Sequence, residues 1–394
     1  MKQILCSCIL AVTVLLPICA QQITLSGRVS MHNSKYRTGT IEYVKNAYVS
    51  APFAGSAATD SEGRFGLDFV GMDAGTQVKV TAEKAGLEVV NGYELQRVII
   101  GRKLPLRVFL AEKGRLAQAQ TELYNISKKA LYAKKDALIS RLLSNEKESQ
   151  AALAELEKDL GIEIGSPAEA IELLDSKIES LEKRLPEFAQ ELAAKNLDFA
   201  SELYIQAYKY YEAGEIEKAI AVLDDAQLEQ SYQDAMGTVA EGKKLEKVGQ
   251  ELQEKGLLQV DQIVDSYELK AEAYNLLFEY RKAANVYEKI IKKLEETKEE
   301  EDIELADAYD EIGGIYQDLG EYSQALFYRE KNVSIKEQQL AENDPDLATS
   351  YNNLALIYKY LGDYEKALAA QQKALAIREQ VLAPDHPCIA PFCD

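Results

Sequence analysis

The sequence contains no tryptophan and only two histidines among its 394 residues. Catalysis by a Ser-His-Asp or Cys-His arrangement needs a histidine held in a formed pocket. His32 stands in a polar stretch of an expected surface loop, and His386 precedes a proline in an expected loop between repeats, so neither fits that role. No P-loop or dinucleotide-binding glycine pattern occurs. We therefore expect no enzymatic activity and no cofactor.

Cysteine is almost as scarce, with five residues in the chain. Three lie in or beside the N-terminal apolar segment and two lie near the other end: Cys6, Cys8, Cys19, Cys388 and Cys393. His386 and the last two cysteines are three possible metal ligands without a fourth, whereas a structural zinc site needs four. A chain of this length also folds without disulfides. We expect neither a metal site nor a disulfide framework.

Basic residues are outnumbered by acidic ones, since 45 Lys and Arg stand against 65 Asp and Glu, for a formal net charge of −20. Such a chain repels phosphate backbones and anionic lipid, which excludes nucleic acid as a partner. A protein or peptide with a basic segment is the expected partner.

Long apolar runs are confined to the first twenty residues. Lys2 precedes an apolar stretch from Ile9 to Leu16, and Ala20 offers a small residue for cleavage. We expect a signal peptide over residues 1–20, cleavage after Ala20, and export to the periplasm or cell envelope. Lipidation of Cys19 is the disfavoured alternative. No later stretch approaches the ~18 consecutive apolar residues of a membrane span, so no integral membrane insertion is expected.

Residues 22–111 show the period-two alternation of β-strands with one buried face. Apolar residues alternate with other residues in four short runs: Ile23, Leu25, Val29; Phe65, Leu67, Phe69; Val78, Val80, Ala82; and Leu104, Leu106, Val108, Leu110. Several such strands in about 90 residues predict a β-sandwich.

This segment resembles the carboxypeptidase regulatory-like domain. The resemblance lies in Ser26–Val29, Lys45–Val49 and the stretch Thr59–Phe65, although the proline usual before the second strand is missing. It implies an accessory module of exported proteins and a turn at Asp60 and Gly63 that closes a hairpin.

Residues 112–195 form an expected helical spacer rich in Ala, Leu, Glu and Lys. Its apolar seam steps by three and four residues: Ile171, Leu174, Ile178, Leu181, Leu185, Phe188 and Leu192. Gly161 and Gly165 break the helix, and Ser166 begins the next one, with Glu169 as the capping-box acceptor. We expect two long helices in an antiparallel hairpin, with a kink or a fresh start at Pro186. An intermolecular coiled coil, and with it a homo-oligomer, is the alternative.

From residue 196 the sequence repeats itself. Tyr280, Tyr322 and Tyr364 stand 42 residues apart (322 − 280 and 364 − 322). Further columns keep this interval: Tyr267, Tyr309, Tyr351; Tyr274, Tyr316, Tyr358; Ala271, Gly313, Ala355; and Ala283, Ala325, Ala367. Each unit predicts two helices that must stack on their neighbours to bury their apolar faces.

The units resemble tetratricopeptide repeats of the kinesin-light-chain-like variant. Ser350–Tyr358 followed by Gly362–Ala367 carries this resemblance. We expect a divergent hairpin and helical insert at 196–260, three repeats and the start of a fourth at 261–390, and a tail at 391–394. The predicted fold is mainly α: a tetratricopeptide-type α-solenoid preceded by a long helical hairpin and a β-sandwich.

The first helix of each unit is expected to line a concave groove. The predicted groove residues are Glu268 and Asn275 in the first unit, Asp307, Asp310, Glu311 and Gln317 in the second, and Asn352, Asn353, Lys359 and Tyr360 in the third. The resemblance implies that asparagine side chains bind a partner's backbone, and Asn353 is the best candidate. Asp265, Glu272 and Asp318 add to the acidic columns that favour a basic segment.

These observations favour an exported scaffold that binds a protein partner in this groove. The alternative is the sensor portion of a truncated envelope signalling protein, because the pattern stops at Pro391–Asp394 as a new unit begins. A glycan-binding role for the β domain is disfavoured, because the chain lacks Trp for stacking on sugars.

Overall fold

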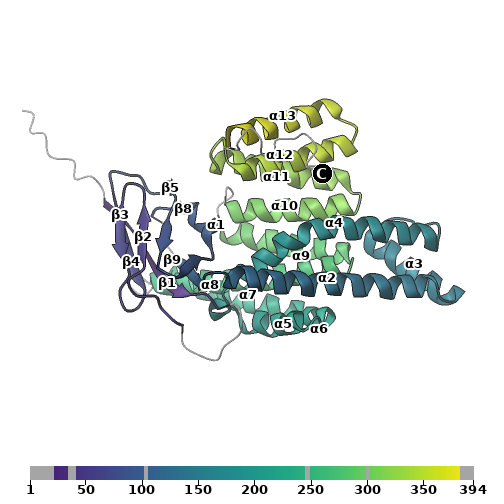
Figure 1. Ribbon diagram of the computed structural model, residues 1–394, viewed down its shortest axis with the longest axis horizontal. Coiled ribbons are helices and arrows are strands. Elements are labelled where there is room, and N and C mark those ends of the chain that lie inside the picture. The colour runs from purple at the N-terminus through teal and green to yellow at the C-terminus, as the bar shows by residue number, and fades with distance from the viewer. Residues whose placement is uncertain (1–21, 34–40, 102–104, 245–248, 299–301, 382–394) are drawn as a thin grey trace, which may run out of the picture. The chain divides into compact units, whose positions relative to one another are not determined.

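The computed structural model describes residues 22–33, 41–101, 105–244, 249–298 and 302–381. The chain divides into two compact units, one of strands up to Lys113 and one of helices from Gly114 onward (Figure 1). The mainly helical fold with a strand-rich N-terminal region is therefore confirmed. The predicted signal peptide, His386, the two C-terminal cysteines and the tail lie outside the described residues.

The first unit contains three sheets among its described residues. Its elements are β1 (Gln22–Met31), β2 (Tyr48–Ala51), β3 (Gly55–Ala58), β4 (Arg64–Val70), β5 (Gln77–Val78), β6 (Thr81–Glu83), β7 (Leu87–Val89), α1 (Gly92–Leu95), β8 (Val98–Ile99) and β9 (Leu106–Glu112). The sheet orders are β4-β1-β9-β7, β3-β2-β6 and β5-β8, with β1 and β9 parallel. Alternate residues of β1, β2, β4 and β9 share one hydrophobic core.

The turn at Asp60 differs from the hairpin that the family resemblance implied. Asp60 Oδ1 accepts hydrogen bonds from the backbone N–H groups of Glu62 (2.8 Å) and Arg64 (2.9 Å), as an Asx turn does. Gly63 has φ +68°, and a Cβ there would lie 2.2 Å from the Val29 carbonyl oxygen. The turn, however, joins β3 to β4, which belong to different sheets. It therefore carries the chain between sheets.

The second unit opens with three helices, α2 (Arg115–Leu142), α3 (Glu146–Leu160) and α4 (Pro167–Ala194). The expected first helix of the spacer is divided, because Asn145 caps α3 by accepting the Glu148 N–H at 3.1 Å. Ser166 caps α4 in the same way, and α4 continues through Pro186 without a fresh start. The apolar seam of α4 is buried except for the half-buried Ile171, and α4 packs against α2 of the same chain.

The remaining helices form the solenoid. After the 3₁₀ turn η1 (Leu197–Phe199) come α5 (Glu202–Glu212), α6 (Ile216–Val222), α7 (Asp225–Gly242), α8 (Gly249–Leu276), α9 (Tyr280–Thr297), α10 (Ile303–Asp318), α11 (Tyr322–Gln339), α12 (Pro345–Tyr360) and α13 (Tyr364–Val381). The pairs α8–α9, α10–α11 and α12–α13 are the three repeated units, and each packs on the next (Figure 1). No described helix is both long and apolar enough to cross a membrane.

Polar contacts between helices repeat with the same interval as the sequence. Tyr309 donates to Glu295 (2.8 Å), and Tyr351 donates to Glu337, which lies 42 residues after Glu295 (337 − 295). In the same way Tyr316 donates to Glu288 at 2.7 Å and Tyr358 to Glu330 at 2.8 Å. Tyr309 and Tyr351 thus bury their rings and Tyr316 and Tyr358 are half-buried, while all four hydroxyls stay bonded.

A candidate partner-binding groove

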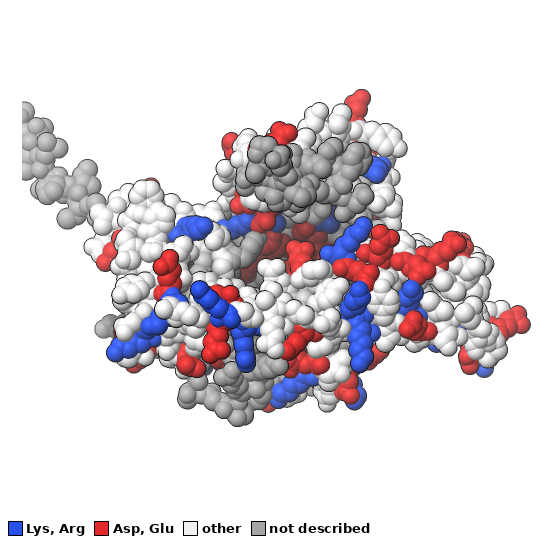
Figure 2. Space-filling view, viewed as in Figure 1, with Lys and Arg blue, Asp and Glu red and all other residues white. Residues whose placement is uncertain are grey.

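The predicted groove residues lie on the first helix of each unit. Glu268 and Asn275 are on α8, and Asn352, Asn353, Lys359 and Tyr360 are on α12. The other four, Asp307, Asp310, Glu311 and Gln317, are on α10. Figure 2 shows acidic side chains gathered in a hollow beside α10 and α4. The contacts below show which of these residues meet.

Asn353 and Asp310 meet across the boundary between α12 and α10. Asn353 Nδ2 donates to Asp310 Oδ2 at 3.3 Å. This bond fixes which way the amide of Asn353 faces. Within the described part of the chain, no hydrogen bond to the Asn353 carbonyl oxygen is present. The side chain is half-buried, so this oxygen and the second amide hydrogen remain available to a ligand.

Arg329 on α11 forms an ion pair with Asp310. Its guanidinium is buried and contacts Asp310 Oδ1 as an ion pair without the alignment of a hydrogen bond. Burial opposes ionisation of Asp310, but the Arg329 charge outweighs it and lowers the pKa of this carboxyl. Gly313 makes room for the arginine, since a Cβ at Gly313 would lie 3.1 Å from Arg329 Cδ. Glycine at this position of α10 therefore leaves the space that the buried Arg329 side chain occupies.

The other predicted residues of α12 are less closely joined to the groove. Asn352 accepts a hydrogen bond from Gln371 Nε2 at 3.1 Å. Tyr360 is exposed and stacks on Tyr322 at a ring-centroid distance of 4.8 Å, at the end of α12. Lys359 is exposed beside it. The structure therefore brings Asn353 together with Asp310 and places Lys359 and Tyr360 at the rim.

The acidic columns of α8 and α10 already meet cations of the same chain. Three basic residues on α4 or directly after it form ion pairs with these carboxylates. Lys195 pairs with Asp265 and, at 3.3 Å, with Glu268. Arg184 pairs with Glu311 at 2.6 Å, and Lys177 pairs with Asp318 at 3.3 Å. Asp307 is likewise paired, with Lys336 of α11 at 2.8 Å. Helix α4 thus lines the side of the groove formed by α8 and α10, and leaves α12 without such a neighbour among the described helices.

One carboxylate of this side has no cation in direct contact within the described residues. Glu272 on α8 accepts hydrogen bonds from Tyr287 (3.1 Å) and from Asn275 Nδ2 (3.2 Å). Burial raises the pKa of Glu272 to about 7. The charge of Arg184 lowers this pKa, and the charge of Glu311 raises it. The groove therefore holds a carboxyl group that titrates near neutral pH.

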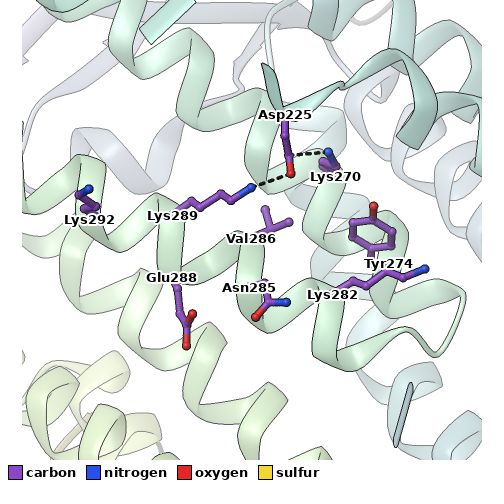
Figure 3. Close-up of a pocket in the computed structure, with 9 residues that line it drawn as sticks. All are labelled: Asp225, Lys270, Tyr274, Lys282, Asn285, Val286, Glu288, Lys289 and Lys292. Carbon is purple, nitrogen blue, oxygen red and sulfur yellow. Dashed lines mark hydrogen bonds and ion pairs between the residues drawn. The ribbon is translucent and has the colours of Figure 1, made fainter. Parts of the chain in front are cut away.

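A second hollow, of about 540 Å³, lies on α8 and α9 and is lined by Asp225, Lys270, Tyr274, Lys282, Asn285, Val286, Glu288, Lys289 and Lys292 (Figure 3). Asp225 of α7 bridges two of its lysines, Lys270 at 2.7 Å and Lys289 at 2.6 Å. One turn further along α7, Glu229 pairs with the buried Lys293 at 2.6 Å. These lysines hold the inserted helix α7 on the first unit.

Two features of the groove were missed by sequence reasoning. The burial of Arg329 could not be predicted, because the column of small residues that includes Gly313 does not indicate which side chain packs against it. The three cations of α4 did leave a trace, since they recur along one side of a helix whose seam was recognised. The acidic residues of α8 and α10 could then have been predicted to pair with these basic residues of the same chain as well as with a partner.

The helices α10–α13 belong to a known repeat type. Residues 304–380, and overlapping them residues 346–390, match the tetratricopeptide repeat family. No curated protein matches this sequence.

Several solved structures are similar. The kinesin light chain nearly identical TPR-like repeats from Podosopora anserina show 20% identity over 48% of this chain and 78% of theirs, with a TM-score of 0.34. BtubC (BKLC) from P. vanneervenii shows 15% identity over 67% of this chain and 94% of its own, also with a TM-score of 0.34. MamA shows 21% identity over 44% of this chain and 95% of its own, with a TM-score of 0.25.

Proposed function

We propose that this protein is a scaffold that binds an extended segment of a protein partner in the groove formed by α10 and α12. The observation that carries the proposal is the chain of contacts from Arg329 through Asp310 to Asn353. A buried cation fixes a carboxylate, and the carboxylate fixes a half-buried amide whose carbonyl oxygen and second N–H have no partner within the described chain. An amide held in this way suits the alternating N–H and C=O groups of an extended backbone.

The location of the site follows from what covers the other repeats. Helix α4 lines the groove side of α8 and α10, whereas the groove face of α12 is not lined by it. The partner therefore lies along α12 and reaches toward α10. The proposal places its basic residues at the α10 end, where the acidic residues already carry internal cations and a basic segment would have to compete with them. The rim residue Tyr360 offers an exposed aromatic surface beside this path.

The binding is tested by site-specific photocrosslinking in cells that produce the protein. A benzophenone side chain at Tyr360 should capture a protein partner, and the same group at Tyr48 in the strand unit should not. Asn353→Ala should reduce the captured partner at least about tenfold, because both contacts of the amide are lost. Asn285→Ala removes an exposed asparagine from α9 and is the matched control. Equal capture by both alanine variants would remove Asn353 from the site.

We also propose that the chain is exported and cut after Ala20. The support is the run of a basic residue, an apolar stretch and a small residue at the N-terminus. Mass spectrometry of the protein from its native cells should find Gln21 as the first residue. A chain that retains residues 1–20 in those cells would contradict this part of the proposal.

A further inference from the structure

One tyrosine column bonds a glutamate of the preceding unit in two of the three repeats. Tyr316 of α10 donates to Glu288 at 2.7 Å, and Tyr358 of α12 donates to Glu330 at 2.8 Å. Tyr274 of α8 belongs to the same column, 42 residues before Tyr316 (316 − 274). Among the described residues, however, the hydroxyl of Tyr274 has no hydrogen bond. The first unit therefore lacks the carboxylate that the other two units place at this hydroxyl.

The glutamate is missing because α7 begins too late. In the second unit, Glu295 lies 3.8 Å from Lys331, and Glu288 stands seven residues, or about two turns, earlier in the same helix. In the first unit, Asp225 takes the place of Glu295, since it pairs with Lys289, the counterpart of Lys331. Asp225 is the first residue of α7. No residue of α7 therefore stands two turns earlier, where the tyrosine of this unit lies.

The direction of α7 leaves a hollow at this end of the first unit. Three contacts each join residues of α7 and α9 that are 64 apart, and so show that the two helices run parallel: Asp225 with Lys289, Glu229 with Lys293, and Tyr232 with Glu296. The first turns of α9 thus lie before α7 begins. The hollow of about 540 Å³ includes Lys282 and Val286 of these turns, together with Tyr274 (Figure 3).

The lining of this hollow is positively charged, whereas the chain as a whole carries a net charge of −20. Four lysines line the hollow against two carboxylates. Both carboxylates are already engaged, because Asp225 bridges two of the lysines and Glu288 accepts from Tyr316. One of the other lysines, Lys292, has no ion pair or hydrogen bond within the described chain. The hollow is therefore complementary in charge to an acidic group.

One of the lysines stands next to the unbonded hydroxyl. The Lys282 ammonium lies 5.5 Å from the centroid of the Tyr274 ring, and Figure 3 shows the two side chains beside each other at one end of the hollow. Lys282 also pairs with Glu279 at 2.8 Å. An ammonium carries three N–H donors, so it can bind a second carboxylate without losing the first. A hydroxyl donor and an ammonium side by side suit one incoming carboxylate.

We infer that the hollow on α8 and α9 binds an acidic side chain carried by a helix of another protein, with its carboxylate accepting a hydrogen bond from Tyr274 and pairing with Lys282. The second and third units supply the pattern, because there the same tyrosine column meets a glutamate of a helix that packs alongside. The inference goes beyond the proposed function, which concerns a basic segment bound at α10 and α12.

The test uses the full chain and a helical peptide built from alanine and glutamine, with one central glutamate and a neutral dye. A second peptide, with glutamine in place of that glutamate, is the uncharged control. Fluorescence anisotropy should show that the glutamate peptide binds about tenfold more tightly, because only a carboxylate forms charge-assisted contacts with the hydroxyl and the ammonium. Equal affinities of the two peptides would overturn the inference.

A pair of tyrosine variants from the same column locates the site. Tyr274→Phe should weaken binding of the glutamate peptide about tenfold, because it removes the hydroxyl donor and keeps the ring. Tyr358→Phe is the matched control, since Glu330 already accepts from this hydroxyl, and it should leave the peptide's affinity unchanged. Equal effects of the two variants would place the peptide elsewhere.

A pair of lysine variants tests the ammonium in the same way. Lys282→Gln should weaken binding of the glutamate peptide about threefold, as expected for an exposed ion pair. Lys366 holds the same position in the last unit, where it pairs with Asp363 at 3.0 Å and lies 5.3 Å from the ring centroid of Tyr358. Lys366→Gln should leave the affinity unchanged. A loss as large as that of Lys282→Gln would reduce the effect to general charge.

Competition with inorganic phosphate separates a protein segment from a free anion. Phosphate at the concentration of the peptide should leave the peptide bound, because it lacks the contacts that the helix makes around the carboxylate. Displacement of the peptide at equal concentration would overturn the assignment to a protein segment.

The outcome is independent of the groove at α12. Asn353→Ala should leave the affinity for the glutamate peptide unchanged, because Asn353 contacts Asp310 and not the hollow. If the peptide binds but Asn353 proves unimportant for partner capture, the acidic-helix site stands and the proposed function fails. If capture depends on Asn353 but the peptide does not bind, the proposed function stands and this inference fails.

Discussion

The first and last repeats of the solenoid carry the same columns of residues in different surroundings. Tyr280 of α9 is fully buried, whereas its counterpart Tyr364 of α13 is 70% exposed. Ala284 of α9 is buried, whereas Leu368, at the same position of α13, is 60% exposed. The first unit, α8 and α9, is enclosed by α3, α4, α7 and α10. Helix α13 has α12 as its main described neighbour.

This contrast separates two kinds of information in a repeat. The repeated columns specify how the two helices of one unit pack together, because α8–α9 and α12–α13 form the same hairpin. They do not specify how much each column contributes to stability. That quantity depends on which other elements cover the unit.

The largest expected difference between the two ends is at the paired tyrosines. Tyr280→Ala should lower the free energy of unfolding by about 3–5 kcal/mol, because it leaves a cavity in the core. Tyr364→Ala should change it by at most about 0.5 kcal/mol, because the ring is exposed. The measurement is the local opening free energy of α9 and α13 from hydrogen exchange.

A control isolates the ring from its hydroxyl. Tyr280 OH has no hydrogen-bond partner within the described chain, so Tyr280→Phe should cost almost nothing. A loss as large as that of the alanine variant would mean that the hydroxyl and not the packing carries the effect.

The second difference concerns ion pairs. Glu229→Gln in α7 should cost about 1–3 kcal/mol, because it leaves the buried ammonium of Lys293 without its counter-ion. At the last repeat, Glu337 of α11 pairs with Lys373 of α13, which is 60% exposed, and Glu337→Gln should cost at most about 1 kcal/mol. Hydrogen exchange of α7 and α13 compares the two. Equal protection losses at both sites would show that enclosure does not strengthen the first unit.

The smallest effect should be the same in the second and the last repeat. Tyr316→Phe and Tyr358→Phe each remove a hydrogen bond to a glutamate of the preceding helix, at partly exposed positions. Each should cost about 0.5–1 kcal/mol. Exchange rates in α10 and α12 provide the measurement. A clear inequality between the two variants would show that even this repeated contact depends on its neighbours.

The repeats could be predicted from the sequence because their pattern is local and recurs. The tyrosine columns and the Gly-Asp turn of the last unit placed α10 to α13 correctly, since spacing along a helix determines which side chains share a face. The capped start of α4 at Ser166 was equally readable. Strands β1, β4 and β9 of the first unit followed from their period-two alternation, whereas the alternating run Val78–Ala82 is divided between β5 and β6 of different sheets.

The arrangement around the groove could not be predicted in the same way. The docking of α4 depends on contacts between residues far apart in the sequence, such as Arg184 with Glu311, and no periodicity reports them. Arg329 is a similar case, because its burial depends on Gly313 in another helix and on Asp310. The connection of β3 to a different sheet at Asp60 shows the same limit, since a turn motif specifies its own geometry and not the pairing of the strands that follow.

The tyrosine–glutamate bonds that recur every unit have an evolutionary consequence. In the second and third units, the tyrosines of these two columns bond glutamates of the unit before, and the glutamates of each column lie 42 residues apart. Loss of residues 303–344 would bring Tyr351 to Glu295 and Tyr358 to Glu288, so both bonds would re-form with new partners. Gain of a unit would preserve them equally. The array can therefore change its length by whole units through duplication or deletion, without the need for new residues at the joint.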